Sequence, residues 1–337
     1  MKALVIKKPG EVTIEEIPEP LNDNELLLLK VRMVGFCGSD LNSFRGNNPL
    51  VNFPRIPGHE VAATIVTGSK SDGALAAGVN VTMSPYTNCG RCASCLRQRP
   101  NACEFNQTLG VQRDGAMTEF ITMPAGKLYP SKLSLKELCI VEPLTVGFHA
   151  VTRARVTADD TVAVLGCGGV GLGAISASHF AGAQTIAIDV DDDKLKLASK
   201  AGATHMINTT TSPLHSRLLD CTGGRGPDVV IEAIGLPHTF RAAVEEVAFS
   251  GRVVYIGWTK EVVSYQTRLF VLKELDILGS RNALPDDFRG VIRMLEEHRF
   301  PIEDAVTSVV PIQHAPELLR EWSEHPGRFT KIMVNVG

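Results

Sequence analysis

Four cysteines in the first third of the chain have the spacing of a metal site. Cys89, Cys92, Cys95 and Cys103 follow the pattern C-x2-C-x2-C-x7-C. One short loop with this spacing presents four thiolates to the corners of a tetrahedron, as in a closed structural zinc site. The alternative is a disulfide cluster, but Cys-x2-Cys pairs are short and strained as disulfides. The sequence therefore predicts a structural zinc lobe over about residues 86–104.

A second set of metal-binding residue types is spread along the same part of the chain. Cys37 lies in Gly-Phe-Cys-Gly-Ser-Asp, His59 and Glu60 lie in Pro-Gly-His-Glu-Val, and Glu142 lies in Val-Glu-Pro-Leu. Three such ligands plus water make a zinc site with an exchangeable position, as catalysis requires. Each residue also has an ordinary interpretation as a buried thiol, a hydrogen-bonded loop histidine or an acid at a helix start. The residues alone leave both interpretations open.

A glycine-rich turn predicts a dinucleotide site. The segment Gly166-Cys-Gly168-Gly169-Val170-Gly171 is G-x-G-x-x-G between a predicted strand, 161–165, and a helix that reaches residue 181. The first glycine permits the tight turn, the second lets backbone amides approach a pyrophosphate, and the third lets helix and strand pack closely. A flavin or another nucleotide fits the same pattern and is not excluded by it.

An acid at the end of the next strand favours NAD over NADP. The predicted strand 185–189 ends in Asp189, 18 residues after Gly171. A carboxylate there accepts hydrogen bonds from the ribose hydroxyls of NAD and repels the 2′-phosphate of NADP. The alternative is a helix cap, but Asp191 and Asp192 are better placed to cap the helix that follows.

Two kinds of element must position these residues. The first 140 residues contain short strand patterns broken by Pro, Gly and Asn, which is typical of a β-dominated domain. After about residue 142, apolar strands alternate with helices, which predicts an α/β domain with a doubly wound parallel sheet. A final strand, 331–336, needs a sheet to join. We therefore expect a catalytic domain over 1–141, a nucleotide-binding domain over 142–278, and a return to the catalytic domain over 279–337.

Composition excludes several other classes of protein. The chain has 337 residues, 44% of them hydrophobic, which is enough for two domains rather than one. Its net charge is −3 without a basic run, so no nucleic-acid partner is expected. Its longest apolar runs reach about half a membrane span, so no membrane association is expected. The charged start is unlike a signal peptide, and with eight cysteines this predicts a reducing cytoplasm.

Taken in order, these motifs resemble the medium-chain zinc-dependent alcohol and polyol dehydrogenases over essentially the whole chain. The segment around Glu142 resembles the sorbitol and threonine dehydrogenase branch. The segment from Gly279 to Phe288 is similar to bacterial sugar-acid dehydrogenases such as L-galactonate 5-dehydrogenase. The resemblance implies a GroES-like β domain, a Rossmann domain, two zinc ions per chain and NAD. The implied reaction transfers a hydride from a secondary alcohol of a polyol or sugar acid to NAD and leaves a ketone.

The resemblance also implies roles for individual residues. Cys37 and His59 would bind the catalytic zinc, and Glu60 or Glu142 would complete the set directly or through water. Asp40 would orient the ring of His59, and Ser39 would accept the proton of the substrate hydroxyl. Arg281 would contact a polar substrate or the cofactor. Thr145 would contact the cofactor, and Lys331 would contact its pyrophosphate.

One position departs from the family pattern, and other functions stay open. Many relatives carry a histidine three residues after the serine, as the last step of a proton relay, where this chain has Asn42. Asparagine cannot take up a proton at neutral pH.

The alternative functions are a threonine-type amino alcohol dehydrogenase, a flavin or quinone reductase, and a non-catalytic nucleotide-binding or regulatory protein. A homodimer or homotetramer is expected, paired through an edge formed by 253–256 and 262–265.

Overall fold

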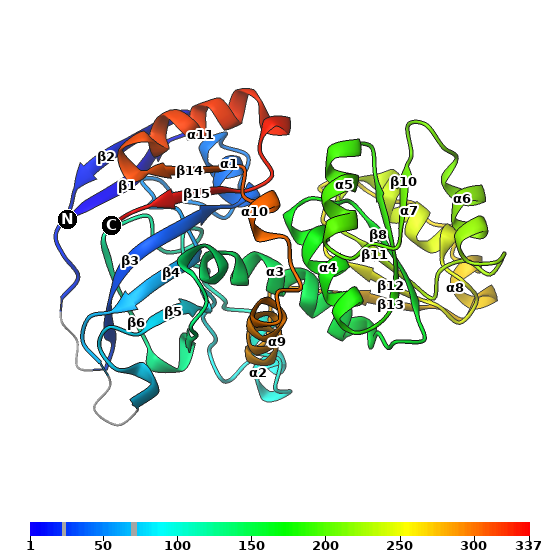
Figure 1. Ribbon diagram of the computed structural model, residues 1–337, viewed down its shortest axis with the longest axis horizontal. Helices are drawn as coiled ribbons and strands as arrows, with labels where there is room; N and C mark the ends of the chain where they lie inside the picture. The colour runs from blue at the N-terminus through cyan, green and yellow to red at the C-terminus, as the bar shows by residue number, and fades with distance from the viewer. Residues whose placement is uncertain (22–24, 69–72) are drawn as a thin grey trace. The chain divides into compact units, whose positions relative to one another are not determined.

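A computed structural model describes residues 1–21, 25–68 and 73–337 (Figure 1). The chain divides into two compact units. Unit 1 comprises Met1–Glu142 and Ile302–Gly337, and unit 2 comprises Pro143–Pro301.

Unit 1 is built around an open, mostly antiparallel sheet with the strand order β14-β15-β3-β4-β5-β7, and β6 also pairs with β3. β1 and β2 form a separate hairpin. Its strands are β1 (Lys2–Lys8), β2 (Glu11–Glu16), β3 (Leu27–Phe36), β4 (Glu60–Ile65), β5 (Asn80–Met83), β6 (Phe120–Met123), β7 (Leu128–Pro130), β14 (Ser308–Pro311) and β15 (Ile332–Asn335).

The last strand returns to unit 1, as its isolation in the sequence predicted. β15 runs antiparallel to β3, with Ile332 opposite Phe36. Side chains from these strands fill one apolar core, in which Phe36, Val34 and Ile332 are almost fully buried. The two ends of unit 1, which are far apart in the sequence, therefore share one core.

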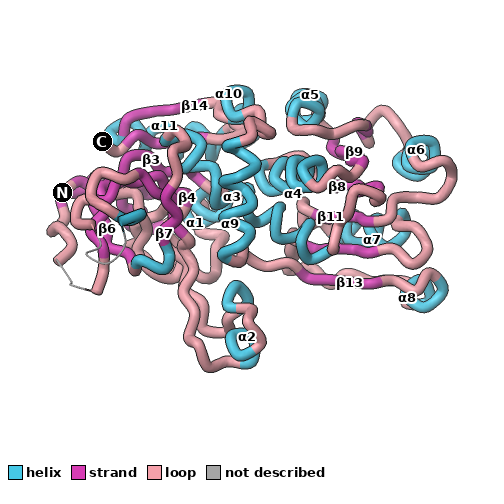
Figure 2. Tube along the Cα trace, turned by 60° about the horizontal axis from the view of Figure 1, so that its bottom comes forward, coloured by secondary structure: helices cyan, strands magenta, loops and turns pink. Residues whose placement is uncertain are grey.

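The helices of unit 1 are few and short. They are α1 (Gly38–Phe44), α2 (Ala93–Leu96), α10 (Ile302–Ala305), α11 (Ala315–Glu324) and the beginning of α3 (Leu135–Ala154). Figure 2 shows the segment that carries α2 as a loop-rich lobe standing away from the strands of unit 1.

Unit 2 contains a parallel sheet with the strand order β10-β9-β8-β11-β12-β13. The order runs outward in both directions from β8, which is the doubly wound arrangement, so the predicted α/β fold is confirmed. Its strands are β8 (Thr161–Leu165), β9 (Gln184–Asp189), β10 (His205–Asn208), β11 (Val229–Glu232), β12 (Arg252–Tyr255) and β13 (Asp276–Gly279). Its helices are α4 (Gly169–Phe180), α5 (Asp192–Lys200), α6 (Leu214–Cys221), α7 (Pro237–Glu246), α8 (Arg268–Leu272) and α9 (Pro285–Glu296).

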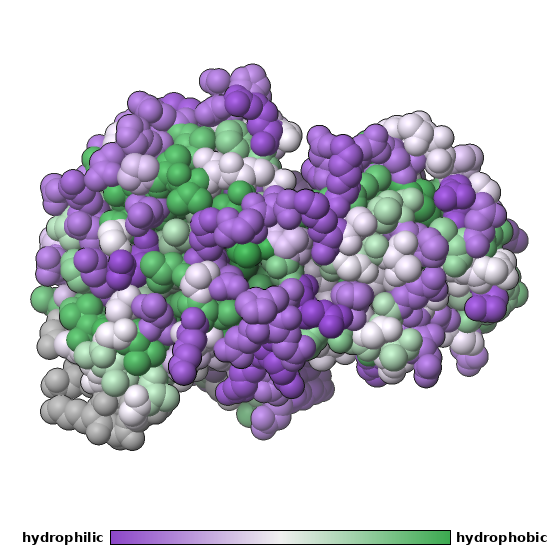
Figure 3. All heavy atoms as spheres, in the orientation of Figure 1, coloured by the Kyte–Doolittle hydropathy of each residue, from purple (hydrophilic) through white to green (hydrophobic). Residues whose placement is uncertain are grey.

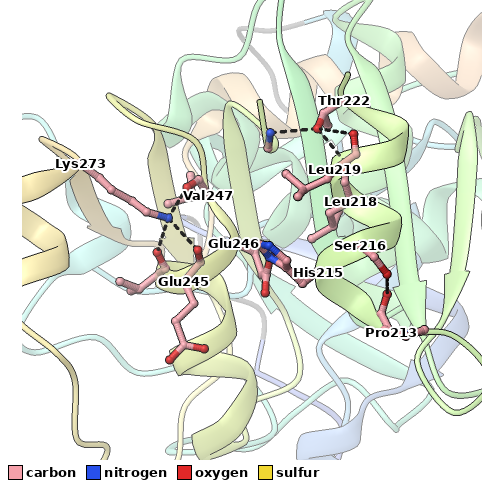
Figure 4. Close-up of polar contacts among 12 residues, drawn as sticks. Pro213, His215, Ser216, Leu218, Leu219, Thr222, Glu245, Glu246, Val247 and Lys273 are labelled. Carbon is pink, nitrogen blue, oxygen red and sulfur yellow. Dashed lines mark hydrogen bonds and ion pairs between the residues drawn. The ribbon is translucent and has the colours of Figure 1, made fainter. Parts of the chain in front are cut away.

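α5 and α7 illustrate how helices of unit 2 pack and end. α5 buries Leu195, Leu197 and Ala198 and exposes charged side chains, so Figure 3 shows hydrophilic atoms over it. At the end of α7, Nζ of Lys273 donates to the carbonyl oxygens of Glu245 and Val247 at 2.6 and 2.7 Å (Figure 4). A cation at this position compensates the negative end of the helix dipole.

The structure differs from the expected domain borders in one large respect. The segment 279–301 belongs to unit 2 rather than to the returning chain. The reason is α9, whose Asp287 lies 2.7 Å from Nδ1 of His149 on α3, and both side chains are buried. α3 itself escaped prediction as one helix because Pro143, a helix breaker in most contexts, lies inside it.

The predicted edge of the parallel sheet was wrong. β12 pairs on both sides, because β13 adds beyond it with Val253 opposite Ile277. β13 is therefore the edge strand, and the segment 262–265 is not a strand. None of the helices in the described ranges is both long and apolar enough to cross a membrane.

Candidate metal and cofactor sites

The pairing of β3 with β4 brings the first group of metal-binding side chains together. Gly35 lies opposite Glu60 in this antiparallel pair. Cys37 follows the end of β3, and His59 precedes the start of β4, so both lie at the same end of the pair. The ligand atoms of Cys37, His59 and Glu60 all lie within 4.8 Å of one another.

Glu60 has a buried counter-charge that the sequence did not reveal. Nζ of Lys331 lies 2.7 Å from both carboxylate oxygens of Glu60 and 3.2 Å from the carbonyl oxygen of Phe36. Burial works to lower the pKa of Lys331, but Glu60 and Cys37 raise it above its ordinary value, so the ammonium stays charged. The predicted pyrophosphate contact of Lys331 is therefore replaced by an ion pair beside the metal-binding group.

Glycine at position 35 makes room for this carboxylate. A Cβ there would lie 2.0 Å from Oε2 of Glu60, which no side chain could tolerate. The small residue opposite Glu60 is thus required by close approach, since the ion pair holds the carboxylate in place.

Asp40 holds the backbone around His59 rather than its ring. Its carboxylate accepts hydrogen bonds from the amides of Cys37 at 2.8 Å and Gly58 at 3.3 Å, while the buried Nδ1 of His59 has no partner. The expected orientation of the ring by Asp40, in which the imidazole would donate to the carboxylate, is not formed among the described residues. Burial works to lower the pKa of His59, but Cys37, Asp40 and Glu142 outweigh it and hold that pKa well above its usual value.

Ser39 and Asn42 lie on α1, which begins directly after Cys37. The hydroxyl oxygen of Ser39 is buried and has no hydrogen-bond partner. Asn42 is exposed. Ser39 is therefore available to a substrate hydroxyl, whereas the position of the family's relay histidine faces solvent.

Glu142 is near this group and is bonded to a residue that the sequence did not indicate. It lies on α3 and is buried, and the hydroxyl of Tyr86 donates to its Oε1. Burial, together with Glu142, Cys37 and Glu60, holds the pKa of Tyr86 well above its usual value, so the phenol remains a donor. Tyr86 lies three residues before Cys89, but no spacing in the sequence links it to Glu142.

The four lobe cysteines also come together. The sulfur atoms of Cys89, Cys92, Cys95 and Cys103 lie within 4.8 Å of one another. The Ser94 hydroxyl and nearby backbone amides lower the pKa of Cys92 to about 5, while burial and the neighbouring thiols raise the pKa of Cys95 to about 11. The lobe thus favours the thiolate form of Cys92, and a bound metal would favour it at its other sulfur ligands, since metal binding releases protons from thiols.

Both groups have the donor chemistry of zinc. The lobe offers four sulfur atoms, which matches a closed structural site. The group of Cys37, His59 and Glu60 offers a sulfur, an imidazole nitrogen and a carboxylate. The buried Nδ1 of His59 has no hydrogen-bond partner. Three protein ligands leave a position for a fourth, as in catalytic zinc sites.

The glycine loop has the geometry that the sequence motif requires. Gly166 has φ of +97°, where side chains are strained. A Cβ on Gly171 would lie 1.8 Å from the carbonyl oxygen of Gly166, so the loop and α4 can be this close only with glycine there. α4 begins at Gly169 with Gly168 as its N-cap, so the amides of Gly169, Val170 and Gly171 form the N-terminus that receives an anion.

Asp189 lies beside this loop at the end of β9. Its Oδ2 accepts from the amide of Cys167 at 2.7 Å, and its Oδ1 accepts from the amide of Val190 at 2.8 Å. Asp191 performs the capping of α5 instead, accepting from Asp193 and Lys194. Asp189 thus occupies the end of the strand next to the glycine loop, where the ribose of a dinucleotide lies in this fold.

The remaining predicted residues lie elsewhere in unit 2. Thr145 is fully buried on α3, and Arg281 is exposed after β13. The sequence did not indicate Glu232, a buried acid at the end of β11. Its Oε1 accepts hydrogen bonds from the amides of Ile234 and Gly235. Glu232 thus shapes the turn that follows β11, the strand next to β8.

Comparison with known proteins finds matches to two domain families and to several dehydrogenases. Residues 23–133 match the alcohol dehydrogenase GroES-like domain, and residues 169–297 match the zinc-binding dehydrogenase family. The chain is 34% identical to sorbitol dehydrogenase of Bacillus subtilis, covering 83% of this chain and 81% of that protein. It is 31% identical to L-galactonate-5-dehydrogenase of Escherichia coli, with 92% of each chain covered.

A solved structure shares the whole fold. The alcohol dehydrogenase RspB of Escherichia coli CFT073, crystallised with NADH, superposes with a TM-score of 0.91 at 27% identity, covering 100% of this chain and 99% of that one. Together with the domain matches, this confirms the expected combination of a GroES-like domain and a doubly wound domain.

Proposed function

Because this chain belongs to the zinc-dependent alcohol dehydrogenase family, we propose that it oxidises a secondary alcohol of a polyol or sugar acid with NAD. The observation that carries the proposal is the convergence of Cys37, His59 and Glu60 at one end of the β3–β4 pair. A structural protein has no need of this second, incomplete ligand set beside a closed four-cysteine lobe.

The proposed chemistry assigns each group a task. A zinc ion held by Cys37, His59 and a carboxylate would supply a Lewis acid for the substrate hydroxyl, and NAD would accept the hydride. Ser39 would accept a hydrogen bond from the substrate hydroxyl through its unpartnered oxygen and would release its own proton as it takes that of the substrate. Burial raises the pKa of Glu60, and Lys331 opposes that effect and orients the carboxylate through its two 2.7 Å contacts. Asn42 cannot take the proton up, so the proton would leave either through the ribose of NAD and water or through Glu142 and water at the metal.

The assignment of the cofactor rests on unit 2. We propose that the amides of Gly169, Val170 and Gly171 receive the pyrophosphate and that Asp189 receives the ribose hydroxyls. NAD is favoured over NADP because the Asp189 carboxylate would repel the 2′-phosphate of NADP. Thr145 and Arg281 are further proposed contacts.

The half-buried guanidinium of Arg113 supports an anionic substrate. Nη2 of Arg113 donates to the carbonyl oxygen of Pro85 at 3.3 Å, next to Tyr86, and its buried Nε has no hydrogen-bond partner. Burial lowers the pKa of this group, yet no carboxylate pairs with it in the described part of the chain. A sugar acid offers the carboxylate that such a group lacks.

The test is NADH formation by zinc-loaded protein with a panel of aldonates, polyols, threonine and short alcohols. Oxidation of aldonates or polyols that is lost in Cys37→Ala supports the proposal. Oxidation of threonine alone moves the protein to the amino alcohol branch. No oxidation, with zinc bound only in the lobe, favours the non-catalytic alternative.

We propose that the protein works as a homodimer or homotetramer in the cytoplasm. The edge strand β13 and the neighbouring α8 expose Ile277, Val271 and Leu272, with Val271 85% exposed. All eight cysteines are free thiols in the structure, which suits a reducing compartment.

A further inference from the structure

Tyr86 is a buried side chain of unit 1 whose hydroxyl donates to Oε1 of Glu142. The sequence motifs do not include it. It comes from the loop between β5 and the lobe cysteines, whereas Glu142 comes from α3, so this bond joins two segments 56 residues apart.

The backbone on both sides of Tyr86 is held in place. Tyr86 forms an isolated β-bridge with Thr108. The carbonyl oxygen of Pro85 accepts from the amide of Leu109 at 3.1 Å, and the amide of Thr87 donates to Gln107 at 3.3 Å. The loop that carries the ring is therefore braced against the segment 107–109.

The lobe adds a second anchor. Cys89 follows Tyr86 by three residues, and its amide donates to the sulfur of Cys103 at 3.4 Å. A lobe closed by four thiolates around one metal is rigid, and this rigidity extends to the residues that enter it.

We propose that Tyr86 is a positioning residue that fixes the Glu142 carboxylate beside the catalytic metal-binding group. This inference rests on the proposed zinc site. A glutamate side chain has several rotatable bonds, and a donor held by a braced loop favours one arrangement of the carboxylate. The partners that orient groups around a metal change its affinity about 10- to 100-fold when removed.

The test uses protein in which cobalt replaces zinc at both sites, because cobalt reports its coordination through its visible spectrum. Tyr86→Phe removes only the hydroxyl. We expect it to change the visible bands of the cobalt at the Cys37 site and to speed the release of that metal to a chelator about 10- to 100-fold. The thiolate bands of the lobe cobalt stay unchanged.

Two further variants separate positioning from general stability. Tyr255→Phe removes a tyrosine hydroxyl that donates to the carbonyl oxygen of Phe240 at 2.9 Å in unit 2, and it should leave both cobalt spectra unchanged. Tyr86→Phe combined with Glu142→Gln should release metal no faster than Glu142→Gln alone, because the two residues act through one bond. Additive effects in the double variant would overturn the proposal, as would an unchanged spectrum and release rate in Tyr86→Phe.

A measurement on the unsubstituted chain covers the case in which Tyr86→Phe does not fold. The chain has four tyrosines, so a label on the ring carbon that bears the hydroxyl gives few signals. Filling the Cys37 site with zinc should shift the Tyr86 signal and leave that of Tyr255 in place. A Tyr86 signal that ignores zinc would contradict the proposal. None of these readouts needs turnover, so they remain informative if the enzyme assay finds no substrate.

Discussion

Nζ of Lys331 lies 2.7 Å from each carboxylate oxygen of Glu60, and both side chains are almost fully buried. The pair joins the start of β15 to the start of β4 across 271 residues of sequence. It thus places a positive charge directly behind the candidate catalytic metal group.

Removing this buried cation should destabilise the protein strongly. Lys331→Met leaves the Glu60 carboxylate buried without its partner, which costs about 3–5 kcal/mol of unfolding free energy. Urea denaturation of the zinc-loaded protein measures the loss. Lys136→Met is the matched control, because its pair with Glu303 is also 2.7 Å long but exposed, and it should cost at most about 1 kcal/mol. Equal losses in the two variants would contradict a special role for the buried pair.

Breaking the lobe should remove one zinc ion and leave the other. Cys95→Ser deletes one of four thiolate ligands, so the zinc content should fall from about two to about one per chain, with a lower melting temperature. Zinc content after dialysis, measured by atomic emission, checks this. Cys221→Ser is the control, because Cys221 lies on α6 and belongs to neither ligand group, and it should retain all its zinc. Full retention in Cys95→Ser would refute a four-thiolate site.

Two aspartates that are two residues apart should have different effects. Asp189→Ser should weaken the binding of NAD about 10- to 100-fold, because hydrogen bonds from the ribose to a charged group are lost. It should also reduce the preference for NAD over NADP. Asp191→Ala should cost about 1 kcal/mol of stability through the lost cap of α5 and leave cofactor preference unchanged. KM values for both cofactors, with urea denaturation, measure the two effects. If the ratio of the KM values for NAD and NADP stays unchanged in Asp189→Ser, Asp189 does not contact the ribose.

Arg113 should distinguish acidic from neutral substrates. Arg113→Met removes the half-buried guanidinium whose buried Nε lacks a partner, so KM should rise about 10- to 100-fold for a substrate with a carboxylate and stay constant for a neutral polyol. Steady-state kinetics on an aldonate and its alditol make the comparison. Arg45→Met, which removes an exposed guanidinium that donates to Ser323, should affect neither KM. A parallel rise for both substrates in Arg113→Met would point to a structural role.

The two edges of the parallel sheet should respond differently to a charge. Ile277 on β13 and Met206 on β10 are similarly exposed, at 39% and 42%. If copies pair through β13, Ile277→Lys should lower the mass in solution to that of a smaller species, because a charge cannot be buried in that interface. Light scattering after gel filtration measures the mass. The same result for Met206→Lys, or none for Ile277→Lys, would argue against assembly through β13.

The sequence by itself was enough to predict the family, the two local motifs and most of the elements. The cysteine spacing of the lobe and the glycine spacing of the β8–α4 turn are local, because each group is held by one short stretch of chain. Alternating strands and helices were enough to predict the doubly wound sheet, since period and length of apolar runs decide those elements.

Tertiary structure decided what depends on distant segments. The register of β3 and β4 brings Cys37 to His59, and the return of β15 brings Lys331 to Glu60 rather than to a pyrophosphate. The bond from Tyr86 to Glu142 and the placement of 279–301 in unit 2 have the same origin. No local sequence pattern predicts these contacts, because the two residues of each pair are far apart in the chain. Their pairing depends on how distant segments pack and on how buried charges are compensated in the folded protein.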